Sequence, residues 1–192
     1  MNKVSTWLYR LSSGWLTLAA LVAFLLFTAL VLPGQSRQAR AGSGGAGSPD
    51  LTFIYNTDDL YRMAEAYGPD GRQAYIRARF TFDLIWPLVY TLFLVTSLSW
   101  ALKGALPDTS RWRVANLVPL LGALLDYLEN LSTSLVMLRY PAPSPGVDWL
   151  ATVFTPAKWV LLGLAFGLLA LGLPLAAWQA QRARKSRPRG KP

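Results

Sequence analysis

The stretch LLDYLENLSTS, residues 124–134, lies inside an otherwise apolar segment that runs from 114 to 138. The hydrocarbon core of a bilayer is ~30 Å thick and takes about 20 helical residues to cross, so the segment is long enough to span it. A central carboxylate costs about 2.5 to 3.5 kcal/mol there, whereas each Leu or Val contributes about −0.3 to −0.6 kcal/mol, and the two sums nearly cancel. The segment therefore needs partners in a bundle, protonation of its acids or a water-filled cavity.

Three further apolar windows accompany this segment, covering residues 15–32, 80–102 and 150–178. The chain has 192 residues that are 53% hydrophobic, with 8 Trp, 8 Tyr and 8 Phe, which is too apolar and too segmented for an ordinary soluble domain. We therefore expect an all-α fold, an integral membrane four-helix bundle that forms a single domain over residues 1–178.

The positions of Lys and Arg predict the orientation of the bundle, because cytoplasmic segments hold the excess of these residues. With four spans, three basic groups fall on one side of the membrane: Lys3 and Arg10, then Lys103, Arg111 and Arg113, then six cations in the tail 179–192. Arg37 and Arg40 fall on the other side and oppose this orientation mildly. The Arg-rich, Leu-rich and Ala-rich composition is typical of GC-rich bacterial genomes. We expect a bacterial inner-membrane protein with both termini in the cytoplasm.

The basic tail contributes much of the net charge of +9. A polybasic segment directly after a span is usually topological, and it gains roughly 1 kcal/mol per cation near an anionic leaflet. We therefore expect membrane lipid as a partner and no nucleic acid.

The first outer loop contains a linker and a short helix. Residues 41–49, AGSGGAGSP, are rich in Gly and Ser and predict a flexible coil. A helix is expected over 57–67, because Asp58 and Asp59 favour its positive end and apolar residues recur after them at helical spacing. The turn GPDG at 68–71 ends it. We expect this extracytoplasmic amphipathic helix to pack on the bundle or to lie at the membrane surface.

An alternative interpretation treats the beginning of the chain as a secretory signal. The tripeptide ARA at 39–41 has the small-x-small form that precedes cleavage. However, the window 15–32 is long for a signal, and ARA lies well beyond its end. We therefore expect an uncleaved first span, whereas cleavage after Ala41 would leave three spans.

The chain contains no cysteine and no histidine. Their absence excludes disulfide exchange, thiolate nucleophiles, His-ligated haem and the usual zinc sites. We expect no metal and no cofactor, and any chemistry must use carboxylates, Lys, Tyr or the backbone.

The polar residues of the third window share one helical face, because Asp126, Glu129, Asn130 and Thr133 follow the spacing i, i+3, i+4, i+7. The second and fourth windows carry a carboxylate and an amine at a similar depth, and two tyrosines offer hydroxyls. We expect one outward-facing pocket with these ligand-binding residues: Asp83, Tyr90, Asp126, Tyr127, Glu129, Asn130 and Lys158.

Two further patterns concern packing around this pocket. The fourth window contains GLAFG at 163–167, a G-x-x-x-G pattern that lets helices approach closely. We expect it to pack this helix inside its own bundle rather than to form a homodimer. Trp86, Trp149 and Trp159 are expected to form walls of the pocket or part of an interfacial belt, and the belt is the favoured role for Trp149.

The cluster leaves three functions open. The first is a binding or transport-type bundle for a lipid or a small amphipathic or cationic molecule, with Asp126 and Glu129 as charge partners. The second is a structural or accessory subunit, in which the polar groups only hold helices together or meet a protein partner in the membrane. The third is an enzyme that acts on a lipid or isoprenoid with a buried carboxylate as general acid or base. We favour the first.

The segments FDLIWPLVY, LDYLEN and FTPAKW together resemble a group of bacterial four-span membrane proteins, over roughly residues 57–175. This resemblance brings no activity with it. In architecture alone the chain is also similar to the EXPERA proteins, which include sterol isomerases and the sigma-2 receptor. That likeness implies intramembrane carboxylates that bind amine or sterol ligands. The absence of histidine departs from the sterol isomerases and puts their chemistry in doubt for this chain.

Overall fold

The computed structural model describes residues 3–185, without the side chain of Arg184, so the end of the predicted basic tail lies outside the described residues. The described part of the chain is all-helical and contains no strand, which confirms the expected all-α class. Its elements are α1 (Lys3–Leu11), α2 (Gly14–Leu30), α3 (Leu32–Gly42), η1 (Pro49–Leu51), α4 (Thr57–Arg79), α5 (Phe82–Ala105), η2 (Arg111–Leu117), α6 (Val118–Arg139) and α7 (Val147–Lys185).

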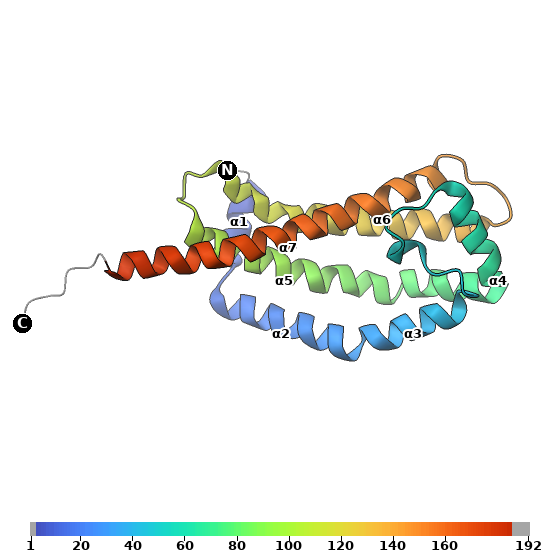
Figure 1. Cartoon of the computed structure of the whole chain (residues 1–192), viewed down its shortest axis with the longest axis horizontal. Coiled ribbons are helices and arrows are strands. Elements are labelled where there is room, and N and C mark those ends of the chain that lie inside the picture. Colours follow the sequence, from blue (N-terminus) through green and yellow to red (C-terminus); the bar gives the residue numbers. More distant parts are fainter. Residues whose placement is uncertain (1–2, 186–192) are drawn as a thin grey trace, which may run out of the picture.

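Helices α2, α5, α6 and α7 run side by side along the molecule, as Figure 1 shows. Helix α7 packs on α5 and α6, and α2 packs on α5. Helix α1 crosses one end of these helices, and α4 covers the other end. Three stretches are long and apolar enough to cross a membrane, by length and composition: Gly14–Gly42, Thr57–Ala105 and Val147–Ala183.

Helix α6 is not among these three stretches, although the sequence predicts a span over 114–138. Its polar residues lower its mean hydropathy. They also face inward, because Asp126, Glu129 and Asn130 are buried whereas Leu124 and Leu131 are exposed. Helix α6 thus presents an apolar surface to its surroundings and a polar one to its neighbours.

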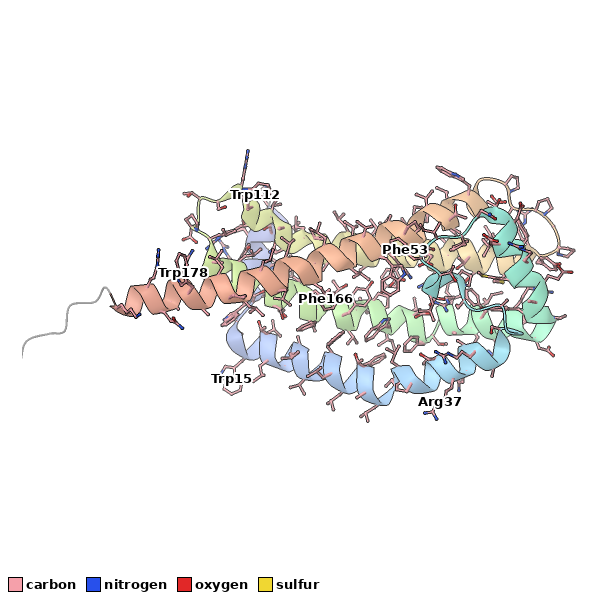
Figure 2. The ribbon with its side chains drawn as sticks, viewed as in Figure 1. Trp15, Arg37, Phe53, Trp112, Phe166 and Trp178 are labelled. Atoms are coloured by element: carbon pink, nitrogen blue, oxygen red, sulfur yellow. The ribbon has the colours of Figure 1, made fainter. Side chains whose placement is uncertain are left out.

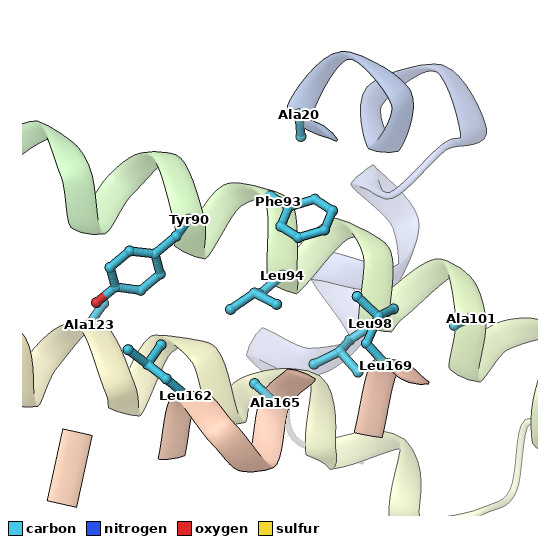
Figure 3. Close-up of a cluster of buried hydrophobic side chains, with 10 residues drawn as sticks. All are labelled: Ala20, Tyr90, Phe93, Leu94, Leu98, Ala101, Ala123, Leu162, Ala165 and Leu169. Carbon is cyan, nitrogen blue, oxygen red and sulfur yellow. The ribbon is translucent and has the colours of Figure 1, made fainter. Parts of the chain in front are cut away.

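A hydrophobic core fills the space between α2, α5, α6 and α7, as Figure 3 shows. Alanines allow the helices to approach, and larger side chains interdigitate between them. Aromatic rings join α2 to α5: Phe24 stacks on Phe93 at 4.7 Å and on Trp86 at 5.7 Å between ring centroids. The buried members are Ala20, Tyr90, Phe93, Leu94, Leu98, Ala101, Ala123, Leu162, Ala165 and Leu169.

Helix α4 begins as the sequence predicts but continues past the expected turn. A capping box starts it, in which the side chain of Asn56 accepts from the backbone N–H of Asp59 and the carboxylate of Asp59 accepts from the backbone N–H of Asn56. At Gly68 the backbone takes φ +61°, which only kinks the element. Pro69 then stands at the first position of a new helical segment, where its missing N–H costs nothing, and the helix resumes as far as Arg79.

The Gly-rich connection after α3 is a packed turn where the sequence predicts a flexible coil. At Gly44, with φ +57°, an added Cβ would lie 2.1 Å from the carbonyl oxygen of Ala66. The hydroxyl of Tyr67 donates to the carbonyl oxygen of Gly47 at 2.6 Å. Glycine is therefore used here for close backbone contact with α4, which composition alone does not distinguish from flexibility.

The expectation for the GLAFG pattern is wrong. A Cβ added to Gly163 or Gly167 would meet no atom within 4 Å, so neither glycine serves a close approach to another described helix of this chain. The tight contacts lie elsewhere: a Cβ on Gly122 would be 3.3 Å from Leu162, and one on Gly104 would be 3.0 Å from Ala176.

Candidate ligand-binding site

A cavity of about 410 Å³ lies between α2, α3, η1, the end of α4, α5, α6 and α7. Such a volume is typical of sites that enclose small organic molecules. The walls are charged towards the end that α4 covers and apolar further along the bundle. They are formed by Phe24, Leu32, Gln35, Ser36, Ala39, Ser48, Asp50, Leu51, Ala78, Arg79, Phe82, Asp83, Trp86, Tyr90, Asp126, Lys158, Trp159, Leu162, Gly163 and Phe166.

The first charged group of the cavity joins α6 to α7. The ammonium of Lys158 donates to Asp126 Oδ1 at 3.0 Å and also forms an ion pair with Glu129. The hydroxyl of Tyr90 donates to the other oxygen of Asp126 at 2.8 Å. Asp126 and Glu129 lie one helical turn apart, so a single amine on the neighbouring helix reaches both.

The second charged group is centred on Arg79, which is buried. Its guanidinium lies 2.7 Å from Asp83 Oδ2 and 3.2 Å from Asp50 Oδ2. It also lies over the ring of Tyr75, 4.4 Å from the centroid, which is a cation–π contact. The side-chain oxygen of Asn130 accepts a further long hydrogen bond from it at 3.5 Å.

The two groups together contain more negative than positive charge. Four carboxylates, those of Asp50, Asp83, Asp126 and Glu129, share two cations, so the cluster has a net charge of −2 when every group is ionised. Burial alone would raise the pKa of Asp50, but the charges of Arg79 and Lys158 and the hydrogen bond from Ser48 outweigh it and hold that pKa below its usual value.

A layer of hydroxyl groups lies next to Glu129, on the side away from the cavity. The hydroxyl of Thr155 donates to Glu129 Oε1 at 2.6 Å, and the hydroxyl of Tyr55 lies 3.0 Å from that of Thr155. The hydroxyl of Tyr75 donates to that of Thr133 at 3.0 Å. The hydrogen bond from Thr155 restricts the rotamers of Glu129, and the hydroxyl of Tyr55 extends this network.

The apolar part of the cavity is lined largely by aromatic rings. Trp86 stacks between Phe24 and Phe27, whose centroids lie 5.7 and 5.5 Å away. Trp159 lines the opposite side, and its indole N–H donates to the carbonyl oxygen of Asp50 at 2.9 Å. Gly163 leaves space beside Phe166, which Figure 2 labels at the middle of the molecule.

A second cavity of about 400 Å³ adjoins the first between α3 and α4. Its walls are more polar and include Gln38, Tyr67 and Arg77. The two cavities share four lining residues, which form the boundary between them: Gln35, Ala39, Ala78 and Arg79. We call this second space the outer cavity and the first the inner cavity.

The structure brings most of the predicted site residues together. Asp83, Tyr90, Asp126 and Lys158 line the inner cavity. Glu129 lies fully buried behind Lys158, and Asn130 faces Arg79. Tyr127 does not join them, because its hydroxyl donates to the carbonyl oxygen of Leu84 at 2.9 Å, away from the cavity lining.

Sequence reasoning missed Arg79 and Asp50. The sequence provides only weak evidence for Arg79. It precedes Asp83 by four residues, but the short connection between α4 and α5 lies between them, so helical spacing does not by itself predict the ion pair. Asp50 carried none, because it follows the Gly-rich segment that was expected to be a coil. Trp86 and Trp159, which the sequence offers as walls, both line the inner cavity.

Among the described residues, no group of three or more acidic side chains is arranged to hold a metal ion. No known protein family, no curated protein and no solved structure matches this chain.

Proposed function

We propose that this chain is a four-span protein of the bacterial inner membrane and that its inner cavity binds a small amphipathic cation. Three stretches are apolar enough to span, and α6 runs beside α5 and α7 as the fourth. The inward orientation of its acids supports this assignment, because ion pairs and hydrogen bonds offset the cost of inserting them.

The distribution of charge supports cytoplasmic termini. The end of the molecule that α1 crosses carries Lys3, Arg10, Lys103, Arg111, Arg113, Arg182 and Lys185. Asp108 is the single acid among the described residues of that end. Cytoplasmic ends of membrane proteins hold such an excess of cations.

One observation carries the ligand class: a cavity with an aromatic part and a charged part in which four carboxylates share two cations. A ligand with one positive group reduces the excess negative charge, and its apolar body fits between Trp86 and Phe166. A neutral molecule gains only the apolar contact with the aromatic walls. An anion of the same length is repelled by the carboxylates.

The test is a titration of the purified protein, in a non-ionic detergent, with decylamine, decanol and decanoate. Trp86 and Trp159 line the cavity, so their fluorescence reports occupancy. We expect decylamine to bind at least about tenfold more tightly than decanol, because hydrogen bonds to charged groups contribute roughly 1.5 to 3 kcal/mol. Decanoate should bind more weakly than either.

The variant Asp126→Asn should lose most of the preference for decylamine, whereas Glu65→Gln, which removes an exposed acid on α4, should retain it. Equal binding of the amine and the alcohol to the wild type would contradict the proposal. If all three compounds fail to bind and a stoichiometric membrane partner copurifies, the chain is an accessory subunit instead.

A further inference from the structure

Helix α1 is amphipathic, but it buries polar side chains and exposes apolar ones, which is the opposite of a surface helix on a water-soluble protein. Ser5, Tyr9 and Ser12 recur at i, i+4, i+7, and all three are buried against the bundle. The opposite face carries Trp7 and Leu11, whose side chains are 58% and 48% exposed. A helix that buries uncharged polar side chains and exposes Trp and Leu is adapted to partly apolar surroundings.

Polar contacts attach α1 to the bundle. The hydroxyl of Ser5 donates to Asn116 Oδ1 at 2.8 Å, and the hydroxyl of Tyr9 donates to the carbonyl oxygen of Arg113 at 2.9 Å. Burial raises the pKa of Tyr9 to about 12, although the charge of Arg113 opposes the rise, so the hydroxyl keeps its proton. These contacts hold helix α1 across the ends of the long helices, where Figure 1 shows it.

The exposed face of α1 combines aromatic and cationic side chains. Lys3, Trp7 and Arg10 recur at i, i+4, i+7 and share one face, and α1 contains no acid. Trp15, which is 83% exposed, lies in the first turn of α2. Figure 2 shows Trp15, Trp112 and Trp178 at this end of the molecule. Cations lie over two of these rings: Arg111 over Trp112 and Arg182 over Trp178.

This pattern matches the boundary between headgroups and acyl chains. Trp is enriched there because its ring is apolar and its N–H is polar, and cations are attracted to anionic headgroups. The one nearby acid, Asp108, forms an ion pair with Arg113 and does not neutralise Lys3 or Arg10.

We propose that α1 is an interfacial helix that inserts Trp7 and Leu11 into one leaflet and binds the headgroups of anionic phospholipids through Lys3 and Arg10. The surface lies at the other end of the bundle from the charged part of the inner cavity, so this proposal is independent of the ligand bound there. Its occupant is the anionic lipid surface itself.

The absence of cysteine from the chain gives a clean test. An environment-sensitive fluorophore is attached at Leu11→Cys, and the protein in non-ionic detergent micelles is titrated with phosphatidylglycerol or phosphatidylcholine. We expect a blue shift of emission at low fractions of phosphatidylglycerol and no comparable shift with phosphatidylcholine. Replacing Lys3 and Arg10 by Gln in the labelled protein should raise the phosphatidylglycerol midpoint by roughly fivefold for each cation removed.

The matched control replaces Arg37 and Arg40 by Gln, which removes the same charge from α3, at the opposite end of the bundle. That variant should keep the wild-type midpoint. Equal effects of both charge removals, or of the two lipids, would overturn the proposal. A second measurement uses nanodiscs that contain phosphatidylglycerol and compares iodide quenching of labels at Leu11→Cys and Glu65→Cys. Equal quenching of the two labels would also overturn the proposal.

Discussion

Lys158 joins α7 to α6 through two ion pairs. Among residues 3–185 it alone forms ion pairs with both Asp126 and Glu129, and all three side chains are buried. An ion pair of this kind contributes little net stability, because removing its members from water costs about as much as their attraction returns. Removing one member, however, leaves uncompensated charge in the interior. The number of partners left behind therefore decides the effect of a substitution.

We expect Lys158→Met to lower the free energy of unfolding by about 3 to 5 kcal/mol, since two carboxylates lose their cation. Adding Asp126→Asn and Glu129→Gln to this variant should restore much of the loss. Thermal unfolding in detergent, followed by circular dichroism, measures both. Lys103→Met, which removes an exposed lysine, serves as the control. A triple variant no more stable than the single one would contradict this account.

Asp50 predicts a dependence of stability on pH. Its pKa in the folded protein lies below the ordinary 3.8, so its carboxylate adds stability above that value and the contribution is lost as the pH falls through the folded pKa. The wild type should therefore exceed Asp50→Asn in stability by a margin that is constant near neutral pH and shrinks below about pH 4. Unfolding midpoints from pH 3 to 7, with Asp58→Asn as the exposed-acid control, measure the margin. A margin that grows on acidification would contradict it.

At the scale of elements, glycine has one use in α7 and another in α6. Gly163 faces the inner cavity with open space around it, whereas Gly122 contacts Leu162 from the neighbouring helix. A small residue thus creates a cavity in one helix and a close contact in the other. Sequence patterns do not tell these uses apart, which is why GLAFG was misread.

We expect Gly163→Leu to fold and to abolish decylamine binding, because the new side chain occupies the cavity. Gly122→Leu should lower stability by about 1 to 3 kcal/mol through overpacking. Gly167→Leu is the matched control, since it also adds a side chain in open space on α7 but lies outside the lining. Tryptophan fluorescence titration and thermal unfolding distinguish the three. Wild-type binding by Gly163→Leu would show that the ligand lies elsewhere.

At the scale of the whole molecule, the described residues of the end that α1 crosses are cationic with Asp108 as their single acid, whereas the end that α4 covers carries acids and cations together. The sequence predicted the excess of cations at the α1 end, three of its four apolar windows and the Asp126–Lys158 proximity, because each follows from local composition or helical spacing. It did not predict α3, the continuation of α4 to Arg79, or the contribution of Asp50. Those depend on contacts between segments distant in the sequence, such as Gly44 against Ala66.

The proposed topology can be measured on single-cysteine variants in intact bacterial cells. A membrane-impermeant maleimide should label Glu65→Cys directly, and it should label Thr109→Cys only after the membrane is permeabilised. Both positions are exposed, so a difference in labelling reports the side of the membrane. The opposite pattern would reverse the orientation, and equal labelling would exclude a bundle that crosses the membrane between α4 and η2.

Arg79 lies in the wall of both cavities. A positively charged molecule that arrives through the outer cavity must pass this fixed guanidinium before it reaches the carboxylates beyond. Attraction by the carboxylates lengthens the residence time of the ligand, whereas repulsion by Arg79 lowers its rate of association. The protein would thus bind its ligand slowly and also release it slowly.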